Sequence, residues 1–167
     1  NFILQLIVTG THLSKKYGFT INEIEKDGFE IDCKINMDIN EDSDKAICFS
    51  LSKLIKELSV NLKVLKPNAI ILLGDRYELL GIAAAATIHK VPIIHLHGGE
   101  ITEGAFDDSI RHSITKLSQI HFVANEEYKK RILQLGENPK HVFNVGGLGV
   151  DAIKRLKFLN KEQLERK

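Results

Sequence analysis

Short hydrophobic runs alternate with longer amphipathic segments along most of the chain, and the alternation is regular from residue 69 onward. The expected strands are residues 69–73, 91–96, 120–123 and 142–145, and the helices expected after them are residues 77–89, 108–117, 126–135 and 150–156. Strict strand–helix alternation is typical of right-handed crossovers between parallel strands. The pattern therefore predicts an α/β fold, with a Rossmann-like parallel sheet flanked by helices.

The earlier part of the chain is less regular. Residues 2–8 form an apolar run and residues 29–35 alternate apolar and polar positions, so both predict strands, with a short helix at residues 20–26 between them. Residues 43–66 form the longest helical pattern, which Pro67 closes. Its apolar stripe predicts a helix that packs onto the sheet.

Composition limits the possible functions without selecting one. The chain has 167 residues, 43% of them hydrophobic and 27% charged, which is ordinary for one soluble globular domain. A net charge of +1 gives no reason to expect nucleic acid or an anionic membrane as a partner. The charge-free run at residues 79–88 is far shorter than the roughly 20 residues of a membrane helix. Cys33 and Cys48 lack a CxxC or zinc-like spacing, so we expect structural thiols in a reducing cytoplasm.

Polar residues follow two neighbouring predicted strands where each strand ends. Gly74 and Asp75 follow the first, and the second ends in His95, His97, Gly98, Gly99 and Glu100. Ligands of an open α/β sheet bind outside the carboxyl ends of its strands, so we expect one cleft here. Asp75 fits either a carboxylate for proton transfer or a cap for the next helix, and Gly74 lets the backbone approach a ligand.

His95 and His97 alternate at the end of a predicted strand, so their side chains are expected on the same side of the sheet. Such a pair could present two imidazole rings to a metal. A third ligand would have to come from Glu100, Asp107 or His112, none of which has a diagnostic spacing. We therefore expect no metal. In the alternative interpretation, His95 is buried against a neighbour and only His97 is exposed.

The segment after His97 contains further candidates. Gly98 and Gly99 indicate either a turn with positive φ or a close approach of the backbone to a ligand. One of Asp107 and Asp108 is expected to be the N-cap of the next helix, which leaves the other available as an acid or base.

Arg111 and His112 are expected in the first turn of that helix, beside free backbone N–H groups. Cations in this position suit a phosphate or diphosphate ligand. Together with the carboxylates and imidazole groups, they indicate acid–base chemistry on a phosphate-bearing small molecule.

Three of these stretches occur in an order typical of one enzyme family: GDRYE at 74–78, HLHGGE at 95–100 and DDSIRHSITK at 107–116. They resemble the hydrolysing UDP-N-acetylglucosamine 2-epimerases of bacterial sialic and legionaminic acid biosynthesis. Similar segments also lie at residues 8–14, 23–29 and 143–151, so the resemblance covers nearly the whole chain.

The resemblance implies the N-terminal half of a glycosyltransferase-B-like fold, in which two Rossmann-like domains hold a sugar nucleotide between them. Residues 1–158 would form the N-terminal domain without its first strand. Residues 159–167 would begin the connection to a C-terminal domain. The family further implies a UDP-sugar substrate, no cofactor, a cytoplasmic location and a homo-oligomer when the protein is full length. The 167-residue piece alone is expected to be inactive.

The implied reaction eliminates the nucleoside diphosphate across C1 and C2 of the sugar to give a glycal-like intermediate. Water then adds at C1 and a proton at C2 on the opposite face, which releases N-acetylmannosamine and UDP. The implied catalytic residues are Asp75, His97, Glu100 and Asp107, and the implied substrate-binding residues are Gly74, Gly98, Gly99, Arg111 and His112.

His97 stands where some members of the family have glutamate, which bears on which sugar nucleotide is used more than on the reaction type. Three alternatives stay open. The first is a non-hydrolysing epimerase, whose product stays attached to UDP. The second is a metal-dependent hydrolase that uses His95 and His97. The third is a sugar-nucleotide-binding module without turnover.

Overall fold

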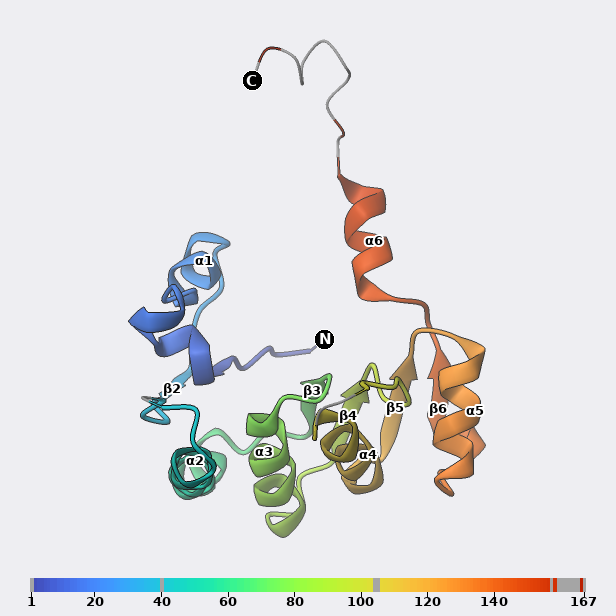
Figure 1. Ribbon diagram of the computed structural model, residues 1–167, viewed down its shortest axis with the longest axis horizontal. Helices are drawn as coiled ribbons and strands as arrows, with labels where there is room; N and C mark the ends of the chain where they lie inside the picture. Colours follow the sequence, from blue (N-terminus) through green and yellow to red (C-terminus); the bar gives the residue numbers. More distant parts are fainter. Residues whose placement is uncertain (1, 40, 104–105, 157, 159–165, 167) are drawn as a thin grey trace.

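The computed structural model describes residues 2–39, 41–103, 106–156, 158 and 166. It contains two parallel sheets (Figure 1). The smaller sheet pairs β1 (Ile7–Thr9) with β2 (Cys33–Ile35). The larger sheet has the order β3-β4-β5-β6, formed by β3 (Ile70–Leu73), β4 (Ile93–Leu96), β5 (Ile120–Val123) and β6 (Val142–Asn144). The predicted parallel α/β fold is confirmed.

The helices occur where the hydrophobic pattern predicts them. They are α1 (Ile21–Lys26), α2 (Asp44–Leu65), α3 (Tyr77–Ile88), α4 (Asp107–Leu117), α5 (Glu126–Gln134) and α6 (Leu148–Arg155). Short 3₁₀ turns occur at η1 (Gly10–Leu13), η2 (Lys15–Tyr17) and η3 (Pro139–His141). No helix in these described ranges is long and apolar enough to cross a membrane.

In the described part of the chain, the core has three clusters of buried residues. One packs α2 and α3 against β2, the second packs α3 and α4 against β3 and β4, and the third packs α5 against β5 and β6. The apolar stripe of α2 contributes Leu54, Leu58 and Leu62, all buried. The alanine-rich helix α3 packs closely against α2, because a Cβ atom on Gly81 would already lie 3.1 Å from Leu51 Cδ2. Parallel pairing of β3 with β4 places their carboxyl ends side by side.

Two predicted strands are shorter than expected. The first covers only Ile7–Thr9, and Phe2, Ile3 and Leu4 are exposed. The second covers Cys33–Ile35 rather than residues 29–35. An apolar run becomes a strand only where a neighbour completes its hydrogen bonds, and β1 and β2 pair over these three residues alone. Most of the expected connection at 159–167 lies outside the described residues.

Candidate functional site

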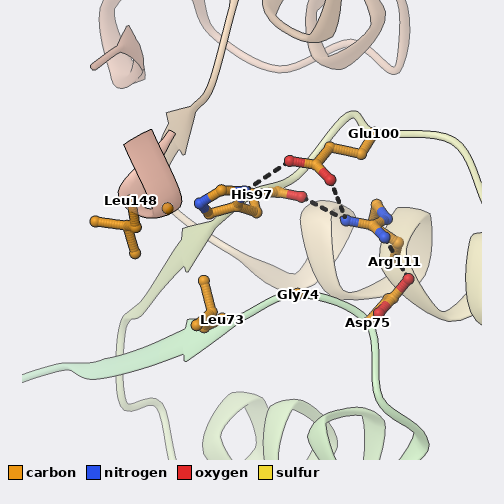
Figure 2. Close-up of a pocket in the computed structure, with 8 residues that line it drawn as sticks. Leu73, Gly74, Asp75, His97, Glu100, Arg111 and Leu148 are labelled. Atoms are coloured by element: carbon orange, nitrogen blue, oxygen red, sulfur yellow. Dashed lines mark hydrogen bonds and ion pairs between the residues drawn. The ribbon is translucent and has the colours of Figure 1, made fainter. Parts of the chain in front are cut away.

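A pocket of about 380 Å³ opens at the carboxyl ends of β3 and β4 (Figure 2). The residues that line it are Leu73, Gly74, Asp75, His97, Glu100, Arg111, Leu148 and Gly149. Five of them are predicted site residues: Gly74, Asp75, His97, Glu100 and Arg111. The strand-end argument therefore led to a real pocket, which the start of α6 completes on one side.

Arg111 is the centre of this site, and it is buried on α4 with 6% of its surface exposed. Its Nη2 atom donates to Asp75 Oδ2 and to Thr102 Oγ1, the second over 3.0 Å. Its Nη1 atom donates to the His97 carbonyl oxygen over 2.8 Å and lies 3.5 Å from Glu100 Oε2. One guanidinium group thus holds two carboxylates and the backbone of the second loop (Figure 2).

The N-terminal end of α4 differs from the prediction. Because α4 begins at Asp107, Arg111 lies one turn beyond the first, and its donors engage protein groups. The N-cap is Phe106, without a side-chain capping bond, so the prediction that Asp107 or Asp108 caps the helix is wrong. Asp108 instead accepts from the Thr102 N–H over 3.3 Å.

Asp75 does not cap the following helix. The N-cap of α3 is Arg76, and no side chain caps that helix. Asp75 Oδ2 accepts from Arg111 and from the Thr102 hydroxyl, the latter over 3.1 Å. Gly74, with φ of 85°, turns the chain out of β3 and aims Asp75 at α4. The capping alternative is therefore excluded, and the carboxylate faces the pocket.

His97 and Glu100 form a pair at the opposite wall of the pocket. His97 Nδ1 lies 2.6 Å from Glu100 Oε1. Since a carboxylate can only accept, His97 donates through Nδ1, and a neutral ring keeps Nε2 free of a proton. In Figure 2 the far edge of this ring points toward Leu148 and away from Glu100. The geometry presents one basic nitrogen to the pocket.

The strand alternation that was expected to place His95 and His97 on one side of the sheet does not extend to His97, so the basis of that prediction is wrong. The strand ends at Leu96, and His97 adopts the left-handed region with φ of 61°. His95 is fully buried, as the alternative interpretation expected. Burial lowers the pKa of His95 to about 4, although its bond to the Gly74 carbonyl opposes the shift. The described residues include no group of His, Cys, Asp and Glu that could hold a metal ion.

Gly98 and Gly99 lie against α5 and do not line the pocket. A Cβ atom on Gly98 would lie 3.1 Å from Ile132 Cδ1, and one on Gly99, where φ is 76°, would overlap the Tyr128 carbonyl oxygen. Arg131 donates to the Gly99 carbonyl from the same helix. Packing accounts for both glycines, and a role in substrate binding stays a prediction.

Asp107 and His112 also lie outside the pocket lining. His112 Nε2 lies 3.5 Å from Asp108 Oδ2 on the same helix. Sequence reasoning missed Thr102 and Arg131, which carry no local motif. It also missed Thr115, although its place four residues after Arg111 puts both on one helix face.

Comparisons with known proteins agree with this arrangement. A family described as UDP-N-acetylglucosamine 2-epimerase matches residues 1–167. A Campylobacter jejuni protein named GDP/UDP-N,N'-diacetylbacillosamine 2-epimerase (hydrolyzing) is 49% identical over 163 residues. The Escherichia coli polysialic acid biosynthesis protein P7 is 44% identical over 164 residues. Each alignment covers 98% of this chain and 42% of the relative, so the chain spans less than half the length of these relatives.

Solved structures share the fold at lower sequence identity. The UDP-GlcNAc 2-epimerase of Neisseria meningitidis, solved bound to UDP-GlcNAc, superposes with a TM-score of 0.75 and 21% identity. It matches 90% of this chain, which covers 40% of that structure. Another UDP-N-acetylglucosamine 2-epimerase reaches a TM-score of 0.78 over 97% of this chain and 43% of its own, at 16% identity. The fold agrees with the expected half of a glycosyltransferase-B-like architecture. This chain belongs to the UDP-N-acetylglucosamine 2-epimerase family.

Proposed function

We propose that the protein carrying this chain is a hydrolysing sugar-nucleotide 2-epimerase. Its substrate would be UDP-N-acetylglucosamine or a related acetamido sugar nucleotide, and its products UDP and a free N-acetylmannosamine-type sugar. Two relatives, 49% and 37% identical, are named as hydrolysing 2-epimerases of diacetylbacillosamine nucleotides. Their names favour a diacetamido sugar as the first substrate to test.

The observation that carries the proposal is the Arg111 network. It holds Asp75 on one wall of the pocket and the Glu100–His97 pair on the other. Epimerisation at C2 needs an acid–base group on each face of the sugar, because the proton leaves one face and returns to the other. Two such groups, facing one pocket and fixed by one cation, meet that requirement.

The steps of the reaction can be assigned in outline to two groups, Asp75 and the Glu100–His97 pair. One group removes the C2 proton while the C1–O bond breaks and the nucleoside diphosphate leaves, which gives the glycal. The other group then protonates C2 from the opposite face, water adds its oxygen to C1, and the proton lost by this water restores the group that protonated C2. Holding both groups within one network supplies orientation, which can contribute a large part of the rate enhancement. Asp107 lies outside the pocket lining, and we assign it no step.

The test is an assay of the complete gene product. UDP-N-acetylglucosamine, and the UDP- and GDP-linked diacetamido-trideoxy sugars, are each incubated with the enzyme in D₂O. We expect release of the nucleoside diphosphate, a free sugar of inverted C2 configuration, and deuterium at C2. An enzyme that releases no diphosphate from any of these substrates contradicts the proposal.

The second candidate is the non-hydrolysing epimerase. A Neisseria meningitidis relative that is 37% identical is named UDP-N-acetylglucosamine 2-epimerase, without the hydrolysing label. In that case the C2-inverted sugar stays attached to UDP, and the products distinguish the two reactions directly. We also propose that the complete protein is a homo-oligomer, since α2 exposes the apolar residues Phe49, Val60 and Val64. Light scattering on the purified protein tests this.

A further inference from the structure

His95 lies directly beneath the pocket, although no part of it is exposed. Its Nε2 atom is 2.8 Å from the Gly74 carbonyl oxygen, and its Nδ1 atom is 3.1 Å from Thr115 Oγ1. Gly98 packs onto the same ring, because a Cβ atom there would lie 3.0 Å from His95 Nδ1. One buried imidazole therefore contacts the ends of both site loops and the helix that carries Arg111.

The two contacts fix the tautomer of this ring. The Gly74 carbonyl can only accept, so Nε2 carries the proton and donates to it. Burial keeps the ring neutral, so Nδ1 has no proton and can only accept from the Thr115 hydroxyl, whose single proton is shared with a second acceptor, the Arg111 carbonyl oxygen 3.0 Å away. Thr115 thereby orients the ring, and the ring holds the carbonyl of the residue directly before Asp75.

We propose that His95 is a positioning residue for Asp75: its Nε2–H···O=C bond to Gly74 sets the direction in which the Asp75 carboxylate leaves β3. The inference rests on the proposed 2-epimerase function, in which Asp75 transfers a proton. Gly74 has φ of 85°, and a Cβ atom there would meet nothing within 4 Å, so local packing does not hold this turn. Two hydrogen bonds anchor it: the Gly74 N–H donates to the Leu96 carbonyl over 3.0 Å, and the Gly74 carbonyl accepts from His95. Of the two, the bond from His95 is made to the peptide group that joins Gly74 to Asp75.

Two substitutions separate the contacts of His95. Glutamine places an amide N–H near the position of Nε2 and can still donate to the Gly74 carbonyl. Asparagine places its amide near Nδ1, keeps the Thr115 contact and loses the Gly74 contact. Both variants give up one buried hydrogen bond and some volume, so both are expected to lower the melting temperature.

The experiment measures steady-state kinetics and thermal unfolding of the complete protein. We expect His95→Asn to lower kcat by about 100-fold, because a shift of about 1 Å in a reacting group can cost that much, with KM changed little. His95→Gln should keep kcat within about 5-fold of the wild type, since the bond to Gly74 is retained. Crystal structures should show the Asp75–Arg111 contact preserved with glutamine and displaced with asparagine.

Equal kcat in the two variants, or kcat that follows only the melting temperature, overturns the positioning role. A wild-type protein that releases no nucleoside diphosphate overturns the proposed function instead. In that event the crystal structures still decide the positioning role, because an Asp75 that stays in place in His95→Asn contradicts it.

Discussion

Arg111 and Asp75 are joined across the pocket although they lie 36 positions apart in the chain, one on α4 and the other after β3. The Arg111 side chain is almost fully buried, whereas the Asp75 side chain keeps 21% of its surface exposed. This ion pair ties the helix to the sheet and leaves one side of the carboxylate open to the pocket. It connects the stability of the fold with the arrangement of the site.

Substitution of Arg111 by lysine should lower both the stability of the fold and the activity of the site. Lysine keeps the charge but cannot contact Asp75, Thr102 and the His97 carbonyl together, because it lacks the planar fork of arginine. We expect kcat to fall by about 100-fold and the free energy of unfolding to fall by about 2 kcal/mol. Kinetics and urea unfolding measure the two effects. The exposed Arg155→Lys is the matched control, and a variant at 111 that behaves like it would contradict the assignment.

Asp75→Asn tests the proton-transfer role with little change of shape. The amide can still accept from Arg111 and Thr102, but it cannot take up a proton at neutral pH. Loss of a general acid or base lowers kcat by about 10² to 10⁴-fold, and we expect a loss in this range with substrate affinity maintained. Asp27→Asn, on the exposed end of α1, should have no effect. Full turnover by the Asp75 variant would remove this residue from the mechanism.

The His97–Glu100 pair predicts non-additive effects. His97→Gln removes the basic nitrogen and should lower kcat by about 10² to 10⁴-fold. Glu100→Gln leaves the ring in place but removes the carboxylate that orients it, so we expect a loss of about 10-fold. Because Glu100 acts through His97, the double variant should be no slower than His97→Gln alone. Multiplicative losses in the double variant would show that the two residues act independently.

Most of this site could be predicted from the sequence because its position follows from the order and direction of the strands. A parallel sheet brings the ends of adjacent strands together, and the polar residues that follow β3 and β4 are visible in the sequence. Periodicity was also sufficient for the fold from residue 69 onward. It was insufficient for residues 2–8, because pairing with a neighbouring strand, which local sequence does not encode, decides how far a strand extends.

The errors have identifiable physical causes. Alternation places His95 and His97 on one side only while the strand continues, but the chain leaves the strand at Leu96 and His97 adopts positive φ. The glycines after His97 suggested a ligand, whereas the atoms that approach them belong to the protein itself, from α5 at Gly99 and from β4, α4 and α5 at Gly98. Thr102 and Arg131 contribute through contacts between distant segments, which no single-sequence pattern reveals.

Gly99 and Gly74 allow a matched comparison of how much stability is lost when a glycine is replaced by alanine. Both have positive φ, at 76° and 85°, so alanine is strained by about 1 kcal/mol at either position. Only at Gly99 would the added Cβ atom also collide with the Tyr128 backbone, which adds about 1 to 3 kcal/mol for overpacking. Urea unfolding should therefore show Gly99→Ala clearly less stable than Gly74→Ala. Equal losses would mean that the loop does not pack closely on α5.

Protonation of buried histidine should destabilise the fold in acid. Burial lowers the pKa of His95 to about 4 from an unfolded value of 6.5, and burial also lowers the pKa of His121. Above pH 6.5 these histidines are neutral in both the folded and the unfolded chain, so the free energy of unfolding has its full value. As the pH falls from 6.5 to 4, the unfolded chain binds the proton and the folded chain does not, so the free energy of unfolding declines, and His95 accounts for about 3 kcal/mol of this. Unfolding curves between pH 4 and 8 measure the decline. His95→Gln should reduce its slope and leave the part due to His121, and an unchanged slope would contradict a neutral, buried His95.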